Sequence, residues 1–429
     1  MKNKNCIIIF NNSWGEVDFI LPILKELKEK KYKIYTSFKN NNLLKKKNDY
    51  KDLYSLLLNI TEIIKPRNIK SKFKIFNVIL NYLLRPKYFF TKIKNFNIFN
   101  LNNYIKNINL DNSENHLKYL EKNEIDLDFL LFADFDTDNY LWIKKYKNKK
   151  FYLFPHAISL RGNHLNKFRN VKKKVFTRDF RRRKFLLEKF PKNTTLFACN
   201  QDELNHFKQF SPKNIKLKVL GYPRLTKKWI NFMHSKITGN NTINNHKKNI
   251  LLVIGKVSYL GFNEIDKKIK EVIKIADNFD YNILIKDHPR NNINFSIYKK
   301  FSNKISIRKS ELSISSALKY CQIMILTSKS GVCLEGVFQK KIVIEYYKYH
   351  TRNFKNNTYE YLIDGKMFSI FKYFNLANSC ENFLQLKRFI YLLENYKSFK
   401  KKIILKQNQG LNKINFFNEQ KFNINLIQN

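Results

Sequence analysis

The sequence predicts an α/β protein of two domains, each an open parallel sheet covered by helices, which face each other across a cleft. Short apolar runs alternate with helical patterns along most of the chain, as in repeated β–α units. Residues 281–285 and 322–326 lack the polar alternation of a half-exposed strand, so both are expected to be central strands and neighbours in one sheet. The polar residues 236–248 separate the two halves and form the expected linker.

Both central strands end abruptly in residues suited to anion binding. The first is followed by a histidine and a proline, and the proline restricts the imidazole to an extended tip. The second is followed by hydroxyl side chains and a glycine ahead of the helical pattern 332–338, whose first amides and dipole favour an anion. The alternative is a plain helix cap at Ser328 or Ser330 and a surface turn at His288. The residues expected to hold a nucleotide's phosphates are His288, Pro289, Arg290, Thr327, Ser328, Ser330 and Gly331.

Length and charge set the limits of the interpretation. The 429 residues suffice for about two to three domains with a sizeable core. The formal net charge of +48 would by itself indicate nucleic acid or an anionic membrane as a partner. Lysine, asparagine, isoleucine, phenylalanine and tyrosine are all over-used together, however, and their codons consist almost wholly of A and T, so genome bias explains much of the charge. We therefore expect no nucleic-acid partner, although a basic surface helps an enzyme that handles anionic donors beside an anionic leaflet.

The cysteines and apolar runs bear on the cellular compartment. Five cysteines, at positions 6, 199, 321, 333 and 380, show neither disulfide nor metal-ligand spacing, which favours a reduced cytoplasm. The apolar run 6–10 is too short for a signal peptide or a membrane span, and no later stretch approaches twenty apolar residues. We expect a cytoplasmic protein, soluble or in peripheral contact with the inner face of the cytoplasmic membrane.

The chain opens with a β–α–β unit. A strand is expected at 6–10, a helix at 17–30 and a second strand at 33–37. The loop after the first strand of such a unit faces the ligand crevice, although its residues also serve as helix caps. The candidate contacts to an acceptor are Ser13, Gly15 and Glu16.

Residues 41–109 have an irregular pattern in which basic and aromatic side chains interleave, as in the run 83–90. The pattern favours a helical insertion that packs its aromatic side chains inward, because exposed apolar patches are uncommon in soluble proteins. An interfacial patch that touches lipid headgroups or a lipid-linked acceptor is the alternative.

Two further strands of the first domain end in groups that can accept a proton. Strand 125–132 is followed by Asp134 and Asp136, and strand 151–154 by His156. A carboxylate or an imidazole at such a tip can deprotonate an acceptor hydroxyl, while a structural turn is the alternative role for the histidine. Overlapping Asp-x-Asp triplets also suit a metal that holds a sugar-nucleotide diphosphate, but the phosphate-site signals lie in the second half of the chain, so we expect no metal ligands here.

The remaining strands define the domain limits. Strands at 196–200 and 217–220 complete the first domain, and the second begins at strand 249–254. We expect a first domain at 1–235 with the insertion at 41–109, a linker at 236–248, a second domain at 249–398, and a C-terminal helix and tail at 399–429 that packs back on the first domain. Further residues expected at the cleft are Gly255, Lys256, Glu335 and Arg224.

Four short motifs together carry a family resemblance. They are PHA at 155–157, GYPR at 221–224, KDHP at 286–289, and TSKSG at 327–331 with Glu335. In this order they resemble the glycosyltransferase-B (GT-B) superfamily, which has two Rossmann-like domains. More narrowly, they are similar to members that use cytidine nucleotides, namely polysialyltransferases, capsular Kdo transferases and teichoic-acid glycerophosphotransferases.

The resemblance implies an enzyme of the bacterial cell envelope, as in capsule polysaccharide biosynthesis. It implies that the His-Pro and Ser/Thr-Ser pairs bind the cytidylate phosphate of a CMP- or CDP-linked donor, with a UDP-linked donor as the lesser alternative, and that no metal or other cofactor is needed. The group would pass to a polysaccharide or a lipid-linked acceptor, with His156 similar to the histidine of the teichoic-acid enzymes. The sequence departs from the pattern at Lys329, between the two serines, and at Ala157, where the glycerophosphotransferases have glycine.

Two other classes of protein fit part of the sequence. UDP-N-acetylglucosamine 2-epimerases share the fold, and residues 136–138, 156–157 and 160–161 are similar to the edge of their first-domain active site. The epimerase pattern has a carboxylate directly after the histidine, whereas Ala157 and Ile158 follow here, so the transferase is favoured. A non-catalytic basic binding protein would explain the charge but not the polar strand ends.

Overall fold

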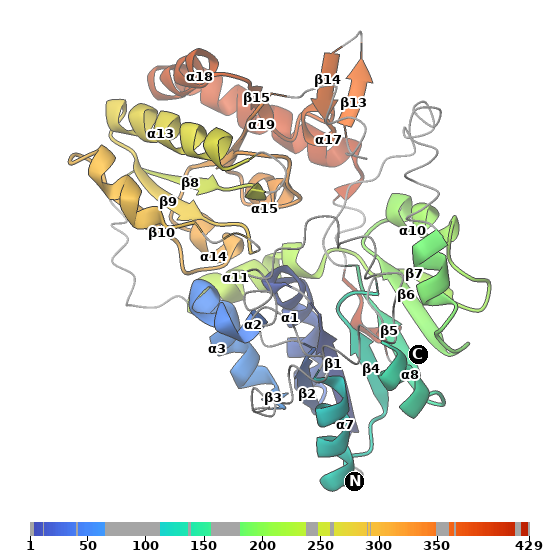
Figure 1. Cartoon of the computed structure of the whole chain (residues 1–429). Helices are drawn as coiled ribbons and strands as arrows, with labels where there is room; N and C mark the ends of the chain where they lie inside the picture. Colours follow the sequence, from blue (N-terminus) through green and yellow to red (C-terminus); the bar gives the residue numbers. More distant parts are fainter. Residues whose placement is uncertain are drawn as a thin grey trace, which may run out of the picture.

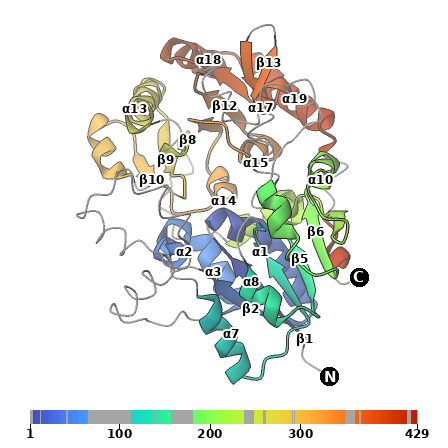
Figure 2. The ribbon, with the colours of Figure 1, turned by 45° about the vertical axis from the view of Figure 1, so that its right-hand side comes forward.

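The structure is a computed structural model built around two parallel β-sheets, one in each half of the chain (Figure 1). It describes residues 4–11, 13–39, 42–64, 112–135, 139–155, 181–236, 248–257, 261–289, 291, 293–348, 360–363, 366–416 and 422–427. A view turned by 45° shows the same two halves, with α1 of the first half and α14 and α15 of the second between the two sheets (Figure 2). The predicted fold class, α/β with two Rossmann-like domains, is confirmed.

The first sheet is parallel at every described pairing. In spatial order it contains β3 (Glu62–Ile63), β2 (Tyr32–Phe38), β1 (Lys4–Phe10), β4 (Phe129–Phe132), β5 (Lys150–Leu153), β6 (Thr194–Ala198) and β7 (Lys216–Val219). Its helical segments are α1 (Trp14–Glu29), α2 (Asn42–Lys45), η1 (Lys47–Tyr50), α3 (Lys51–Ile60), α7 (Ser113–Lys122), α8 (Tyr140–Lys145), α10 (Gln201–Lys208), η4 (Pro223–Leu225) and α11 (Lys227–Lys236).

The second sheet is also parallel at every described pairing. In spatial order it contains β10 (Ile307–Lys309), β9 (Asn282–Lys286), β8 (Asn249–Val253), β11 (Ile323–Leu326), β12 (Ile342–Tyr346) and β15 (Asn378–Cys380). Around it lie α13 (Phe262–Asn278), η5 (Phe295–Phe301), α14 (Ile314–Leu318), α15 (Cys333–Phe338), the hairpin β13 (Glu360–Ile363) and β14 (Lys366–Ser369), α17 (Ile370–Tyr373), α18 (Phe383–Asn395), α19 (Lys397–Lys413) and η6 (Ile424–Ile427).

One prediction about the second sheet is wrong. The strands 281–285 and 322–326 were expected to be neighbours, whereas β8 lies between β9 and β11 and pairs with both. The reason is the winding of the chain: it places β8 in the centre, builds β9 and β10 on one side, and then crosses to build β11 and β12 on the other. Alternation of apolar residues gives the burial of a strand but not its order in the sheet.

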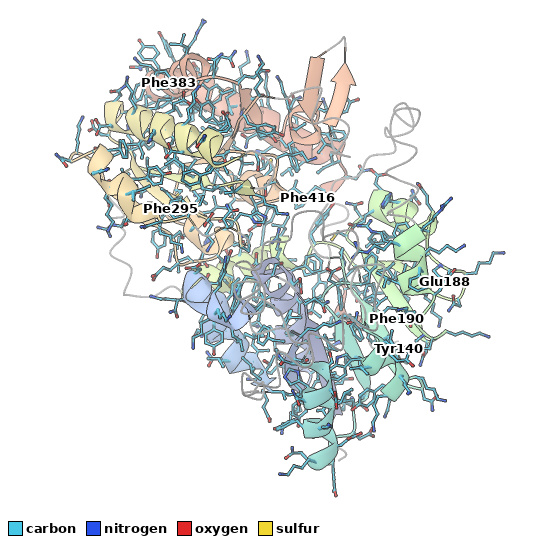
Figure 3. The ribbon with its side chains drawn as sticks, in the orientation of Figure 1. Tyr140, Glu188, Phe190, Phe295, Phe383 and Phe416 are labelled. Carbon is cyan, nitrogen blue, oxygen red and sulfur yellow. The ribbon has the colours of Figure 1, made fainter. Side chains whose placement is uncertain are left out.

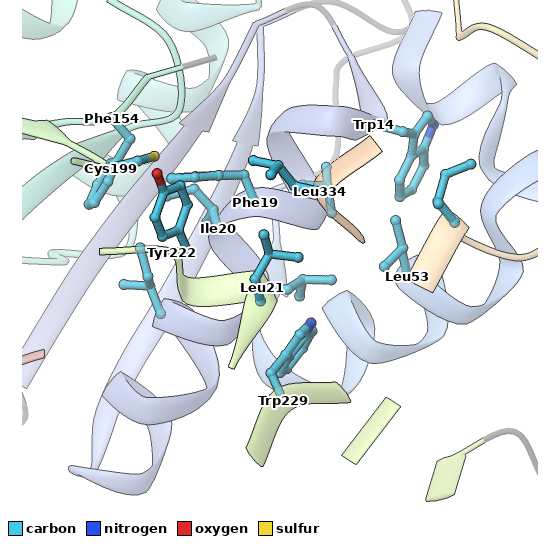
Figure 4. Close-up of a cluster of buried hydrophobic side chains, with 14 of the residues drawn as sticks. Trp14, Phe19, Ile20, Leu21, Leu53, Phe154, Cys199, Tyr222, Trp229 and Leu334 are labelled. Carbon is cyan, nitrogen blue, oxygen red and sulfur yellow. The ribbon is translucent and has the colours of Figure 1, made fainter. Parts of the chain in front are cut away.

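The two halves share one hydrophobic core. A single cluster of buried side chains contains Trp14 and Leu53 from the first half and Met324 and Leu334 from the second. Figure 4 shows Leu334 of α15 among side chains of α1 and α3. Helix α15 packs tightly on its sheet because Gly336 faces it: a Cβ there would overlap Met324 and Val343. The two sheets are therefore joined by packed apolar surface as well as by the chain.

The C-terminal segment returns to the first half of the chain. Phe416, labelled in Figure 3, lies with its ring centroid 5.0 Å from that of Tyr222 and 5.5 Å from that of Phe338. Lys30 donates to the amide oxygen of Asn425 at 2.7 Å. The residues after α19 thus pack across both halves.

All five cysteines are buried free thiols. Among the described helices, none combines the length and the apolar character that a membrane crossing requires.

Candidate functional site

The topology of each sheet identifies where a ligand crevice forms. In both sheets the chain winds outward from the first strand in one direction and then crosses to the other side, giving the order 3-2-1-4. Ligands of such sheets bind outside the carboxyl ends of the two strands at which the winding reverses. These strands are β1 and β4 in the first half, and β8 and β11 in the second.

Hydrogen bonds lock the loops at the ends of β8, β9 and β11 together. Gly255, just after β8, donates its N–H to the hydroxyl of Thr327, just after β11, at 2.8 Å. The Asn291 side chain donates to the Gly255 carbonyl at 2.9 Å and accepts from the Val257 N–H at 3.0 Å. Thr327 is fully buried, so its hydroxyl positions the loop after β8. The loops after β8, β9 and β11 are therefore joined to one another by hydrogen bonds.

Asp287 shapes the tip that carries the predicted histidine. One of its carboxylate oxygens accepts from the His288 N–H and from the Asn291 side chain, both at 2.8 Å. Burial raises the pKa of Asp287, while these hydrogen bonds lower it. His288 and Pro289 are half-buried at the end of the turn, and Asn291 donates its N–H to the His288 carbonyl at 2.9 Å.

Neither predicted serine caps the helix after β11. The N-cap of α15 is Val332, and no side chain accepts a hydrogen bond there. Ser330 and Gly331 contribute only carbonyls to the first turn, which accept from Cys333 and Leu334 at 3.1 and 3.2 Å. Ser328, Ser330 and Gly331 are half-buried. The capping alternative is thus not observed for these hydroxyls.

At the matching edge of the first sheet, Glu16 holds the loop after β1. Its carboxylate accepts from the N–H groups of Asn11 at 2.7 Å and Ser13 at 3.1 Å, and it is fully buried at the start of α1. The Asn11 side chain donates to the Asp134 carbonyl at 3.0 Å and so joins the ends of β1 and β4. Asp134 is buried. Gly15 lies in the first turn of α1.

A buried ion cluster spans the two halves behind these loops. Arg224, from the predicted GYPR turn, pairs with Asp18 of α1 at 2.9 Å and with Glu335 of α15 at 3.0 Å. Ser315 of α14 donates to the second oxygen of Glu335 at 2.8 Å. All three charged side chains are more than nine-tenths buried. Glu335 and Arg224 were predicted at the cleft; the structure shows both buried in an ion cluster between the two halves.

Two carboxylates share one guanidinium in this cluster. Burial raises the pKa of Asp18 to about 7; Arg224 counteracts this, and Glu335 adds to it. Asp18 therefore keeps its proton well above the pH at which an exposed aspartate loses it. The Arg224 Nε and one Asp18 oxygen have no hydrogen-bond partner among the described atoms.

A segment of the first half covers the tip of β9. Lys286, the last residue of β9, donates its ammonium group to the Asp49 carbonyl at 2.7 Å and lies 3.7 Å from the centre of the Tyr50 ring. Burial lowers the pKa of Lys286 to about 8, against the attraction of Asp52 and Asp49. Lys46 donates to the carbonyls of Pro289 and Asn291, both at 2.6 Å.

The same segment binds the N-cap residue of a helix of the second half, Ser313 of α14. Asp52 accepts from the Ser313 N–H at 3.0 Å and from its hydroxyl at 2.7 Å, just before α14. The Lys51 N–H donates to the Glu311 carbonyl at 3.0 Å, and Lys309 pairs with Asp49 at 2.7 Å. We call residues 42–60 the docking segment. It holds the two halves together directly beside the predicted phosphate residues.

The described residues among those predicted follow the carboxyl ends of β1 and β4 in the first half and of β8, β9 and β11 in the second, apart from Arg224 and Glu335. Lys256 is half-buried on the loop after β8. Three predicted residues lie outside the described part of the chain: Asp136, His156 and Arg290. In the part that is described, no three side chains among His, Cys, Asp and Glu gather as a metal-binding group.

Four residues that bear on the site were not selected from the sequence: Asp18, Asp52, Lys286 and Asn291. Asp18 had a signal, since it is the one charged residue in the otherwise apolar run 17–21 of a predicted helix. No local sequence pattern marks Asp52 or Asn291, because their hydrogen-bond partners lie 261 and 36 residues away in sequence.

Comparison with solved structures agrees with the fold. An S. aureus MnaA–UDP co-structure matches with a TM-score of 0.53 at 13% identity, covering 99% of this chain and 98% of that chain. A putative UDP-N-acetylglucosamine 2-epimerase from Listeria monocytogenes matches with 0.53 at 12%, covering 96% and 95%. The glycotransferase of kitacinnamycin matches with 0.48 at 8%, covering 98% and 100%. No protein-family model and no curated protein matches the sequence.

At such identities the likeness shows the fold alone. The chain has the two-domain architecture used by proteins that handle sugar nucleotides, over nearly its whole length.

Proposed function

We propose that the protein is a GT-B glycosyltransferase or glycerophosphate-type transferase. It moves a group from a nucleotide-activated donor, CMP- or CDP-linked in preference to UDP-linked, to a polysaccharide or lipid-linked acceptor of the cell envelope. The observation that carries the proposal is the locked set of loops at the winding reversal of the second sheet, where Gly255, Thr327 and Asn291 hold one another. These loops present His288 and Ser330 at the edge where such sheets bind phosphates.

The chemistry assigned to this edge is stabilisation of the leaving phosphate. An imidazole and hydroxyl donors held by fixed loops cost no reorganisation as charge builds on the donor's phosphate oxygens. The Asp287 carboxylate fixes the His288 backbone, so the ring starts from a defined position. The edge thus has a means of favouring the transition state over the bound donor.

The acceptor is assigned to the opposite edge, where β1 and β4 end. The proposed base is His156, with Asp136 and then Asp134 as the next candidates, and Ser13 and Gly15 are proposed acceptor contacts. A base variant is expected to bind nucleotide normally and lose turnover. If His156→Ala retained near-full transfer while Asp136→Ala were inactive, the carboxylate would be the base.

The donor site is tested by two substitutions and one matched control. His288→Ala and Ser330→Ala are each expected to lower kcat/KM with a CMP- or CDP-linked donor, the histidine variant by about a hundredfold, since each removes a donor to the leaving phosphate. Ser296→Ala is the control: its exposed hydroxyl, in the same half of the chain, contacts only Asn294. Wild-type transfer and nucleotide binding by His288→Ala would refute the site.

Metal independence is part of the proposal. A phosphate seat made of backbone amides, hydroxyls and imidazole has no need of a divalent cation, so transfer is expected to persist in EDTA. Complete loss that manganese restores would move the chemistry to Asp134 and Asp136.

A second candidate function is that of a UDP-N-acetylglucosamine 2-epimerase, because a putative enzyme of this class has a similar fold. Against it, Ala157 and Ile158 follow His156 where the epimerase pattern has a carboxylate. Incubation with UDP-N-acetylglucosamine and no acceptor separates the two: inversion at C2 of the sugar would support the epimerase. The transferase is supported by acceptor-dependent release of the matching nucleotide: CMP from a CMP-linked sugar or from transfer of a glycerophosphate group out of a CDP-linked donor, and CDP from glycosyl transfer out of a CDP-linked sugar.

The transferase would work at the inner face of the cytoplasmic membrane, in peripheral contact with it, because its proposed acceptors are made there.

A further inference from the structure

Helices α18 and α19 carry an unusual concentration of positive charge. Residues 383–413 contain eight basic residues and one acidic residue, Glu394, against 82 and 34 in the whole chain. Glu394 is already paired, since its carboxylate contacts Lys248 and the Tyr281 hydroxyl. The basic residues are Lys387, Arg388, Lys397, Lys400, Lys401, Lys402, Lys406 and Lys413.

The same two helices expose large apolar side chains. Leu384 is 74% exposed and Leu405 is 58% exposed, and Tyr391 and Tyr396 are each about half exposed. A single exposed leucine needs no explanation, but aliphatic and aromatic side chains interleaved with lysines are typical of helices that lie on a membrane surface.

The exposed groups form a defined face of α18. Leu386, Ile390 and Leu393 are buried against the sheet and occupy one side of the helix. Leu384, Arg388 and Tyr391, spaced by four and three residues, occupy the opposite side. On α19, Leu405 and Lys401 are both exposed and lie four residues apart on one side, while Ile403 and Gln407 are buried.

This face lies far from the proposed reaction site. Figures 1 and 2 both place α18 at the end of the second half that points away from the first sheet, and α19 runs from there back toward the first half. Phe383, at the start of α18, lies at that outer end in Figure 3. A surface bound there leaves the facing edges of the two sheets open to donor and acceptor.

We propose that the outward face of α18 and the adjoining part of α19 dock on an anionic phospholipid membrane. Lysine and arginine at the rim meet the lipid phosphates, while Leu384 and Tyr391 enter the boundary between headgroups and acyl chains. Exposed leucine favours a lipid over a nucleic-acid partner, because a phosphate backbone offers it nothing to pack against. Docking does not depend on the donor chemistry, so a chain without transferase activity would still bind.

The experiment is co-sedimentation of the full chain with vesicles of phosphatidylcholine alone or mixed with phosphatidylglycerol. Wild-type protein is expected to bind only the anionic vesicles, with an affinity that falls as salt rises. Replacing Lys387, Arg388 and Lys401 with glutamine should weaken binding about a hundredfold, at roughly fivefold for each charge near the surface. Leu384→Gln should weaken it about tenfold, since an apolar contact with the acyl boundary is lost.

A second triple variant with the same loss of charge is the control. Lys208, Lys213 and Lys216 are exposed on the first half of the chain, and their replacement by glutamine should change vesicle binding by less than about threefold, because they lie outside the proposed docking face. Equal losses in both triple variants would show diffuse attraction and overturn the proposal. So would unchanged vesicle binding by the first triple variant together with weakened binding of a DNA duplex, which would identify a nucleic-acid surface. Thermal unfolding of each variant at the wild-type temperature verifies folding.

Discussion

Arg224 determines at the scale of single side chains how the two halves of the protein meet. It lies between an aspartate of α1 and a glutamate of α15, and all three side chains are buried. Removing one partner from a buried ion pair leaves an uncompensated charge, which typically costs about 3–5 kcal/mol. The cluster should therefore make a large contribution to holding the folded chain together.

Arg224→Met is accordingly expected to lower the free energy of unfolding by about 3–5 kcal/mol in urea denaturation. Arg181→Met is the matched control: Arg181 is exposed, and its loss should cost less than about 0.5 kcal/mol. Adding Glu335→Gln to Arg224→Met should recover part of the loss, because it removes a charge left without its partner. Equal stability of the two arginine variants would contradict the bridge.

Asp18 makes the stability of the fold depend on pH. Burial raises the pKa of Asp18 in the folded chain to about 7, above its value in the unfolded chain, which lies near 3.8. Between these values the folded chain binds more protons than the unfolded chain, so this group's contribution is fully present below pH 4 and is lost as the pH rises through 7.

The Asp18→Asn variant tests this dependence. Its unfolding free energy relative to wild type should increase steadily from pH 4 to pH 7, because asparagine loses no proton over that range. The exposed Asp280→Asn serves as the control, with a nearly constant difference from wild type. Parallel curves for Asp18→Asn and wild type across this range would show that Asp18 holds no extra proton.

The sequence predicted some of the residues at the strand ends but not their partners from distant segments, and the reason is physical. The residues at the strand ends, such as His288 and Thr327, follow directly from where an apolar run stops. The partners of Asp52 and Arg224 depend on how distant segments pack, which no local pattern contains. Arg224 and Glu335 were both selected from the sequence, but Asp18 was not, and neither was the ion cluster that the three residues form.

At the scale of elements, the docking segment 42–60 is what closes the first half onto the second. Its lysine and aspartate side chains reach the end of β9 and the start of α14. Asp52 holds Ser313, the N-cap residue of α14, whose hydroxyl accepts from the Ser316 N–H at 3.3 Å, and a lost cap typically costs about 1 kcal/mol.

Asp52→Ala should therefore loosen α14 locally. Hydrogen exchange at the amides of residues 313–318 is expected to speed up about fivefold or more, because local opening needs less free energy. Glu311→Ala is the control, since Glu311 is exposed in its ion pair with Lys51 and should leave these amides unchanged. Equal exchange rates in both variants would show that the docking segment contacts α14 without stabilising it.

The positions of helices and strands along the chain were predicted more fully than the order of the strands in the sheet. The opening β–α–β unit and the strands β8, β9, β11 and β12 occur where apolar periodicity placed them, within a few residues at their ends. The position of β8 between β9 and β11 was missed, because pairing partners are chosen by the crossover connections and not by the strands themselves.

In the molecule as a whole, two parallel sheets, each with the strand order of a doubly wound fold, share one apolar core. The fold was predictable from the sequence because repeated β–α units with buried strands admit few other architectures. The nucleobase of the donor was not predictable from such patterns, since the residues that would contact it lie in loops whose sequence follows no periodic rule.

We propose above all that the edge formed by β8, β9 and β11 binds the phosphates of a cytidine nucleotide. The test is the thermal unfolding temperature of the wild-type chain and of His288→Ala with CMP, CDP, UDP or GDP, since at equal concentration the ligand that binds the folded state more tightly raises that temperature further. We predict that CMP and CDP stabilise the wild-type chain more than UDP or GDP, and that His288→Ala loses most of this effect. Absence of stabilisation by every nucleotide, or equal stabilisation of wild type and His288→Ala, would contradict the claim.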